Sequence, residues 1–438
     1  MTLHRLGFWL TLAVVAAATG PVFGNEPDPA PRRLTLAEAE QLALARNSDF
    51  RIAQAQVAAA LGQLKTAREF PNPTLGLSTA KLDTDGQTNG TPMGNGLLNR
   101  SYDSIVSLSQ LFLVAKRGVM RDAADAGVHV AEFQRDDARR LLRQAVGLAY
   151  LAALDAREQV RVLQYSAAAL RQEAEIAAVR FRAGDVSASD QAQIEIAAEQ
   201  DELNAASQEA AAKTAVVTLE TLLGDPQPSG TTPLADTLAQ LQQSASPDLE
   251  DLSVEKRPDV AAAEDAVSQA ESQVTLQKRQ RIPDVTVSVQ YEREPPDAPN
   301  TVGIGLSLPL PLWNRNAGAI LSAQAARDQA GEQLAKVRIH AAADVTSARV
   351  AYSEAAARAQ RYQGSLLPKS ATVVASVKYA YQKGGASLVD LLEAERNDNL
   401  VRVSAAQAQA DAASAAVTLR AALGRLDESS SPTVPAPP

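Results

Sequence analysis

Two short stretches with one shared pattern, FRAGDVSASD at residues 181–190 and YQKGGASLVD at residues 381–390, organise this chain. In each, an aromatic residue is followed three positions later by a glycine, and three positions after that by a serine. The glycine can adopt the positive φ that ends a helix, and the serine can cap the next helix. Each copy also separates two long alanine-rich stretches. One copy alone would indicate only a loop between antiparallel helices, whereas recurrence at a fixed spacing favours an internal duplication.

The composition favours helices that pack closely against one another. Hydrophobic residues make up 45% of the 438 residues but aromatic residues only 4%, so alanine supplies much of the apolar share. A chain of this length usually forms two or more globular domains, unless it is repetitive or elongated. The net charge of −9 argues against nucleic-acid binding, because phosphate binding needs concentrated lysine and arginine.

The residue types that carry most enzyme and metal chemistry are scarce. Cysteine is absent, which excludes disulfides and thiolate metal sites, and the three histidines (His4, His129 and His340) are not in ligand spacing. The sequence offers no candidate nucleophile–base pair and no phosphate-binding loop. We therefore expect no enzyme and no bound cofactor or metal.

Residues 1–24 have the pattern of a secretory signal peptide. His4 and Arg5 precede an apolar run from Leu6 to Ala18, and small residues lead to a cleavage position after Gly24. The alternative is a short buried helix. Because no cysteine is present, lipid attachment at that position is not expected. No later segment has the roughly 20 apolar residues of a membrane-spanning helix, so entry into a membrane would have to use strands.

The sequence divides into two halves with the same order of elements. The first half, residues 25–225, begins with a helix that Thr35 and Glu38 can start through a capping box. Its predicted helices cover about 34–68, 116–183 and 187–223, and its predicted strands about 74–82 and 102–112, joined by an exposed loop at 83–101. A polar linker is predicted at 226–250.

The second half, residues 251–425, repeats this order. Its predicted helices cover about 258–281, 317–383 and 387–423, and its predicted strands about 285–292 and 301–308. Pro368 should kink or locally unwind the second of these helices close to its far end. The proline-rich residues 426–438 are predicted to be disordered.

Both strands of the second half alternate between apolar and polar residues. The apolar residues are Val285, Val287, Val289 and Tyr291 in the first strand and Val302, Ile304, Leu306 and Leu308 in the second. We expect the opposite face to line an aqueous lumen through Thr286, Ser288, Gln290, Glu292, Thr301 and Ser307. Four strands cannot close a barrel, but three chains would supply twelve. The alternative is a soluble β-hairpin packed against helices.

The ordered set of motifs resembles the TolC-like outer membrane efflux proteins. The motifs are FPNPTLGLS at 70–78, RIPDVTVSV at 281–289, FRAGDVSASD and YQKGGASLVDLLEAE at 381–395. The stretch GLSLPLPLWNRNAG at 305–318 is similar to the CzcC-like heavy-metal efflux branch of that family. The resemblance covers about residues 34–425.

This resemblance implies a mainly α fold with a small β part, built from a duplicated helix–strand–strand–long helix–long helix unit. A homotrimer would form one twelve-stranded β-barrel in the lipid of a Gram-negative outer membrane, continued by an α-helical tunnel through the periplasm. The implied function is the passive exit duct of a tripartite RND-type efflux system. Its implied partners are an inner-membrane RND transporter and a periplasmic adaptor (membrane fusion protein), and its implied cargo is heavy-metal cations. The alternative is a periplasmic coiled-coil scaffold or adaptor without a pore.

The resemblance also assigns roles to the two turns, which it places at periplasmic tips. Asp390 and Glu393, three residues apart on one helical face, match acidic positions of the family's periplasmic gate. In a threefold assembly each would form a ring of carboxylates that attracts cations, and the alternative is a solvated acidic face. The positions that match adaptor contacts are Gly184, Asp185, Ser187, Gly384, Gly385 and Ser387.

The second turn departs from the family pattern at one position. Where relatives carry a basic residue that latches the closed state, this chain has Ala386. A latch would then be absent, or built from Arg180, Arg182 or Lys383. Asp190, the first-copy equivalent of the gate aspartate, is expected on the outer side or as a helix cap.

Overall fold

The computed structural model of the chain describes residues 33–80, 87–88, 91–92, 103–244, 254–294 and 298–424. The predicted signal peptide (1–24) and the predicted disordered tail (426–438) lie outside these residues. So does the predicted exposed loop at 83–101, apart from the two-residue strands β2 (Gln87–Thr88) and β3 (Thr91–Pro92).

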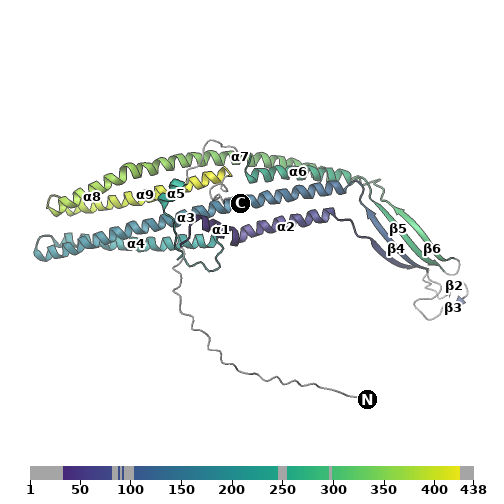
Figure 1. Ribbon diagram of the computed structural model, residues 1–438, viewed down its shortest axis with the longest axis horizontal. Helices are drawn as coiled ribbons and strands as arrows, with labels where there is room; N and C mark the ends of the chain where they lie inside the picture. The colour runs from purple at the N-terminus through teal and green to yellow at the C-terminus, as the bar shows by residue number, and fades with distance from the viewer. Residues whose placement is uncertain are drawn as a thin grey trace, which may run out of the picture.

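The molecule is elongated, with a four-stranded sheet at one end and two helical hairpins that point to the other end (Figure 1). The first half contains α1 (Leu36–Arg46), α2 (Ser48–Arg68), β1 (Thr74–Ala80), β4 (Asp103–Phe112), α3 (Arg117–Ala183) and α4 (Ala188–Leu222). The short helix α5 (Leu238–Ser244) follows. The second half contains α6 (Pro258–Arg279), β5 (Val285–Glu294), β6 (Ala298–Ser307), α7 (Ala317–Arg361), the π-helical turn η1 (Tyr362–Leu366), α8 (Leu367–Gln382) and α9 (Leu388–Ala422).

The first helical segment is interrupted at Asn47, which the sequence analysis did not predict. The Asn47 side chain accepts hydrogen bonds from the backbone amides of Asp49 and Phe50 and so caps α2. Its amide nitrogen donates to the carbonyl of Leu222 at 3.0 Å, which ties this break to the end of α4. The capping box of Thr35 and Glu38 at the start of α1 is confirmed.

The predicted effect of Pro368 on the helix that contains it is also confirmed. The segment from Tyr362 to Leu366, which ends two residues before this proline, is π-helical and separates α7 from α8. Proline cannot donate the usual backbone hydrogen bond, and its ring clashes with the preceding turn, so the helix widens there. The second half therefore reaches its hairpin turn through two helices, whereas the first half uses the single helix α3.

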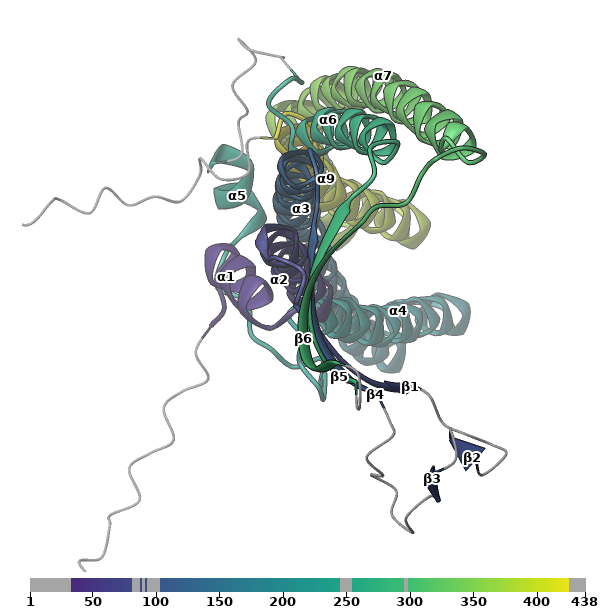
Figure 2. The same cartoon turned by 90° about the vertical axis from the view of Figure 1, so that its right-hand side faces the viewer.

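The four main strands form one antiparallel sheet in the order β1-β4-β5-β6. The central pair, β4 and β5, joins the two halves of the chain, and the sheet is curved (Figure 2). In this order β1 and β6 each have one edge without a partner strand among the described residues.

Four helices follow the same order as the strands. The chain passes from α2 to β1, from β4 to α3, from α6 to β5 and from β6 to α7, and α2–α3, α3–α6 and α6–α7 are packed neighbours. Small residues allow close approach: a Cβ added at Gly147 on α3 would lie 3.1 Å from Val417 on α9. None of the helices in the described part of the chain is long and apolar enough to cross a membrane.

The segment predicted as a polar linker packs against α1 and α3. Leu34 and Leu234 form an isolated parallel β-bridge, and α5 follows it. The Tyr150 hydroxyl, buried on α3, lies 2.7 Å from the Leu34 carbonyl oxygen and 2.8 Å from the Asp236 carboxylate. The Asp236 carboxylate also accepts a hydrogen bond from the amide of Leu36. Residues 226–244 thus form part of the folded body beside the middle of α3.

A buried carboxylate fixes the start of this segment. Glu220 on α4 is only 2% exposed, and it accepts hydrogen bonds from the amide of Gly230 (2.7 Å), the amide of Thr232 (3.2 Å) and the hydroxyl of Thr232 (2.6 Å). Burial opposes ionisation of Glu220, but these hydrogen bonds outweigh it and hold the pKa of the carboxyl below its usual range.

Glu220→Gln should destabilise the protein at neutral pH, by about 1–3 kcal/mol, because one amide group cannot accept all of these hydrogen bonds. The folded-state pKa of Glu220 lies below its unfolded value of 4.5, so its contribution is complete above pH 4.5 and is lost as the pH falls through the folded pKa. Thermal unfolding at pH 7 and near pH 4 should show the difference between wild type and variant shrinking in acid. Glu209→Gln, an exposed residue on the same helix, is the control, and an equal effect at both positions would contradict the prediction.

Candidate functional site: a two-faced sheet and paired helical tips

The strand register places most of the apolar residues of the four strands on one face of the sheet. One row across the strands is Leu75, Leu108, Val289 and Ile304, and the next is Leu77, Val106, Tyr291 and Val302. All eight side chains are exposed, and Ile304 reaches 83%. Polar residues also occur on this face: Gln110, whose side chain donates to the carbonyl of Pro71, and a further row of Thr79, Ser104 and Arg293 beyond Leu77, Val106 and Tyr291. A contiguous exposed apolar face of this kind indicates contact with lipid or with another protein surface.

The residues predicted to face a lumen share the opposite face. Glu292 pairs with Thr301 and Thr286 pairs with Ser307, so strands β5 and β6 contribute polar side chains at the same level. Ser288 and Gln290 lie between these pairs on β5, opposite Gly305 and Gly303. A Cβ at Gly305 would lie 2.5 Å from the Ser288 hydroxyl, so glycine leaves the room that this polar side chain occupies. On β4, Ile105 and Leu111 interrupt the polar face.

At the opposite end of the molecule, the two predicted turns have the same backbone structure. Gly184 and Gly384 have positive φ values of 81° and 75°, as the sequence predicts. Each glycine amide donates to the carbonyl three residues before it, and the next amide, of Asp185 or Gly385, donates to the carbonyl five residues before it. Ser187 and Ser387 then cap α4 and α9 as predicted. The residues predicted to contact an adaptor therefore form two exposed hairpin tips of equivalent backbone structure.

The two tips differ in what their aspartates do. The Asp390 carboxylate accepts hydrogen bonds from the Ser387 amide (2.9 Å) and hydroxyl (2.7 Å), which completes a capping box and lowers the pKa of Asp390. The Asp190 carboxylate makes no such bond within the described chain, and Ser187 contacts the Ser189 hydroxyl instead. Glu393 is exposed one turn after Asp390. The candidate gate aspartate thus also stabilises its own tip.

Contacts between the two hairpins involve residues that the sequence analysis did not single out. Glu173, buried on α3, pairs with Lys378 on α8 at 2.7 Å, and this hydrogen bond raises the pKa of Lys378. The sequence position of Glu173 could have identified it, because Glu173 lies in the core-facing stripe of α3 with Leu170 and Ala177. A buried carboxylate in such a stripe needs a partner.

The three candidate latch residues have different contacts. The Arg180 guanidinium lies over the ring of Tyr381 in the other hairpin, 5.7 Å from its centroid. Arg182 donates to a carbonyl of its own helix, and Lys383 lies near Tyr379 of its own hairpin. Arg180 is therefore the one of the three with a contact in the other hairpin among the described residues.

No group of three or more histidine, cysteine, aspartate or glutamate residues that could hold a metal ion occurs in the part of the chain that the structure describes. The exposed carboxylates of Asp390 and Glu393 at the second tip are negatively charged groups that attract cations through space.

Comparison with known proteins identifies the family of this chain. Residues 39–225 and 249–425 match the outer membrane efflux protein family. The chain is 26% identical to the cobalt-zinc-cadmium resistance protein CzcC of Cupriavidus metallidurans over 417 residues, which cover 94% of this chain and 96% of that protein. It is also 26% identical to the pyoverdine export outer membrane protein OpmQ of Pseudomonas aeruginosa over 393 residues, covering 85% of this chain and 80% of OpmQ.

Among solved structures, the outer membrane protein VceC of Vibrio cholerae shares the fold, with a TM-score of 0.70 at 19% sequence identity. The similarity covers 89% of this chain and 96% of VceC. The residues matched by the family, 39–225 and 249–425, include both hairpin tips and all four main strands. This chain therefore belongs to the outer membrane efflux protein family.

Proposed function

We propose that three copies of this chain form one duct through the outer membrane and the periplasm, and that the duct passively conducts the cargo of an efflux pump. The observation that carries this proposal is the sheet with one exposed apolar face and one polar face. With three chains, twelve strands would close around a polar lumen and leave the apolar face to lipid. The residues proposed to face that lumen are Thr286, Ser288, Gln290, Glu292, Thr301 and Ser307.

The edges of the single chain support a closed assembly of several copies. Within the described ranges, strands β1 and β6 each have one edge without a partner strand, and the helices that continue them, α2 and α7, expose large apolar side chains. These are Ile52 and Leu61 on α2 and Leu321, Ile339 and Val350 on α7. Unpaired edges and apolar helix faces at both sides of one curved unit are what neighbouring copies would cover.

The hairpin tips are the proposed docking end. They lie farthest from the sheet, so a sheet in the outer membrane directs them into the periplasm (Figure 1). There they would receive a periplasmic adaptor, which connects the duct to an inner-membrane RND transporter. The Arg180–Tyr381 and Lys378–Glu173 contacts would hold the two tips of each chain together beneath the acidic ring of Asp390 and Glu393.

Heavy-metal cations are the cargo that we propose. The similarity to CzcC spans nearly the whole of both chains, and the exposed tip carboxylates would favour cations over anions. The similarity to OpmQ, whose name states pyoverdine export, makes an organic cargo the second candidate. The alternative of a periplasmic scaffold without a pore gains nothing from these findings, because a scaffold has no use for an exposed apolar sheet face.

Ile304→Lys should remove the protein from the outer membrane, because a lysine on a lipid-facing strand position costs about 2–4 kcal/mol at the bilayer midplane. The expected result is loss of the heat-modifiable trimer from the membrane fraction, together with loss of tolerance to cobalt, zinc and cadmium salts. Thr301→Lys, on the polar face of the same strand, is the matched control for membrane insertion and should retain the trimer. A wild-type chain found wholly in the soluble periplasm would refute the duct, whereas a membrane trimer without any effect on metal tolerance would refute only the metal cargo.

The combined change Asp390→Asn and Glu393→Gln should lower the cation preference of trimers in planar bilayers. Asparagine can still accept the hydrogen bond from Ser387, so the tip should stay folded while its charge is removed. The cation-to-anion permeability ratio should fall at least about twofold at low salt and converge with wild type near 1 M salt, where charges are screened within roughly 3 Å. Asp190→Asn is the control. An unchanged cation-to-anion permeability ratio in the double variant would mean that these carboxylates only face solvent and do not act as a gate.

Gly385→Phe should abolish metal tolerance in cells that contain the transporter and adaptor, while leaving trimers in the membrane. Gly385 does not have a positive φ, and the nearest atom to an added Cβ is the Ala380 carbonyl oxygen at 3.6 Å, so the fold should accept a side chain. A phenylalanine would instead obstruct a partner seated on the tip. Gly385→Ala is the conservative control and should retain tolerance, and full tolerance in Gly385→Phe would argue against docking at this tip.

A further inference from the structure

Four basic side chains gather where the sheet of the second half meets its helices. Lys278 and Arg279 lie in the last turn of α6, Arg281 lies just before β5, and Arg315 lies between β6 and α7. All four side chains are exposed, and none forms an ion pair with the described part of the chain. The nearby acidic residue, Asp284, is already paired with Lys116 at 2.7 Å. This junction is therefore a patch of uncompensated positive charge in a chain whose net charge is −9.

The patch is continuous with the most exposed apolar side chains of the junction. Leu310 and Leu312 are exposed, and Trp313 is 93% exposed, between the end of β6 and Arg315. Arg281 donates from its Nε to the carbonyl oxygen of Arg315 at 3.0 Å, so the two sides of the patch are linked. Tryptophan beside arginine and lysine is the composition of a membrane–water interface, where the ring lies at headgroup level.

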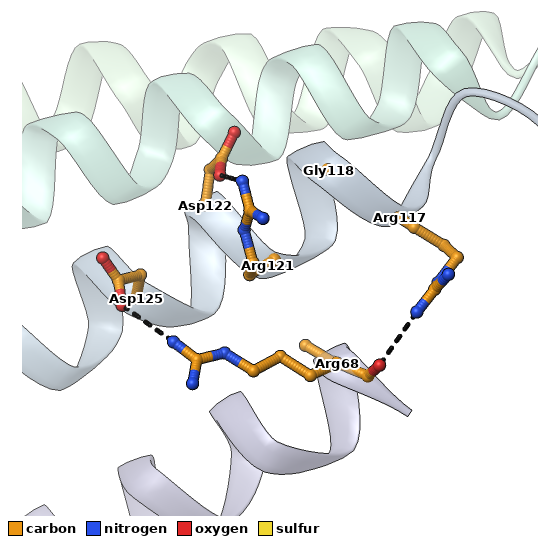
Figure 3. Close-up of a pocket in the computed structure, with 7 residues that line it drawn as sticks. Arg68, Arg117, Gly118, Arg121, Asp122 and Asp125 are labelled. Atoms are coloured by element: carbon orange, nitrogen blue, oxygen red, sulfur yellow. Dashed lines mark hydrogen bonds and ion pairs between the residues drawn. The ribbon is translucent and has the colours of Figure 1, made fainter. Parts of the chain in front are cut away.

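The first half has a related but partly neutralised cluster at its own junction. Arg68, Arg117 and Arg121 line an open cavity of about 630 Å³ between the end of α2 and the start of α3 (Figure 3). Asp122 and Asp125 approach Arg121 and Arg68 at 3.2 and 3.9 Å. The Arg117 guanidinium stacks on Phe70, 3.5 Å from the ring centroid, and donates to the Arg68 carbonyl oxygen, while its buried Nε has no partner. The four residues of the second half are therefore the stronger anion site.

Helix stabilisation accounts for only part of this pattern. Lys278 and Arg279 in the last turn of α6 interact favourably with the negative end of the helix dipole. Arg281 and Arg315 lie outside the helix, and a dipole interaction does not explain the exposed Trp313 beside them.

We propose that Lys278, Arg279, Arg281 and Arg315 bind the phosphate groups of anionic phospholipids in the leaflet at the helical end of the sheet. The inference rests on the proposed function, because it requires the apolar sheet face to lie in lipid. With that face in the hydrocarbon, Leu310, Leu312 and Trp313 reach the boundary of the acyl region and the four basic groups reach the headgroups. The phospholipid contact would then fix how deeply each chain sits in the membrane.

The test measures the lipid preference of purified full-length trimers. Thermal stability in neutral detergent is compared after addition of phosphatidylglycerol, phosphatidylcholine with the same acyl chains, or inorganic phosphate, and bound phosphatidylglycerol is counted by native mass spectrometry. The variant Lys278→Gln, Arg279→Gln, Arg281→Gln and Arg315→Gln removes the patch. A second variant keeps the positive charge of the patch through the changes Arg279→Lys, Arg281→Lys and Arg315→Lys. The control replaces four exposed basic residues of α7 and α8, Lys336, Arg349, Arg361 and Lys369, by glutamine.

Wild type should bind and be stabilised by phosphatidylglycerol in preference to phosphatidylcholine. Each basic residue near an anionic surface contributes about 1 kcal/mol, so the quadruple glutamine variant should lose at least about tenfold of that preference. The lysine variant and the control should retain it. Equal preference in wild type and the glutamine variant, no preference in wild type, or equal stabilisation by inorganic phosphate would each overturn the lipid site while leaving the duct intact. Failure of the wild type to reach the membrane would overturn the proposed function and this inference together.

Discussion

The antiparallel pairing of β4 with β5 is the contact on which the rest of the structure depends. It joins the two halves of the chain, and its register places Val106 opposite Tyr291 and Leu108 opposite Val289. Side chains alternate along a strand, so a slip of one residue would move the apolar set of one half to the polar face of the other. The chain would then have two mixed faces and no surface suited to lipid. The register therefore decides both the architecture of the sheet and its proposed location.

The helices that leave the sheet keep the order of the strands along the length of the molecule. Each of α2, α3, α6 and α7 continues one strand, so the strand order becomes the helix order, and the hairpin tips at Gly184 and Gly384 lie at the far end (Figure 1). The tips share backbone geometry because the same glycine and serine recur. They differ in charge and packing, since Asp390 closes a capping box and Arg180 reaches across to Tyr381. The two halves therefore end in turns of the same backbone geometry whose side chains make different contacts.

Local features were predictable from the sequence, and long-range ones were not. The alternation in β5 and β6, the positive φ at Gly384 and the disruption before Pro368 depend on residues close together in the chain. The break at Asn47 depends partly on the carbonyl of Leu222, and the fixed position of residues 226–244 depends on Glu220 and Tyr150. These contacts join positions far apart in the sequence, so the periodicity of apolar residues along the chain does not predict them. The Glu173–Lys378 pair was predictable in part. A carboxylate in an apolar stripe indicates that some partner must be present, but the sequence does not show that this partner is Lys378.

The distribution of charge in the proposed duct favours the tips as the place where ions are distinguished. On the polar face of β5 and β6, the six proposed lumen residues include one charged group, Glu292, and a barrel of twelve strands is wide enough for water to screen it. At the tips, Asp390 and Glu393 lie on successive turns of one helix, and threefold symmetry would bring six carboxylates around one opening. Screening limits each charge to a reach of about 8 Å at physiological salt, so such a ring acts on ions only where the opening is narrow. Selectivity would therefore follow the closure of the tips, and the contacts that hold the hairpins together would control both.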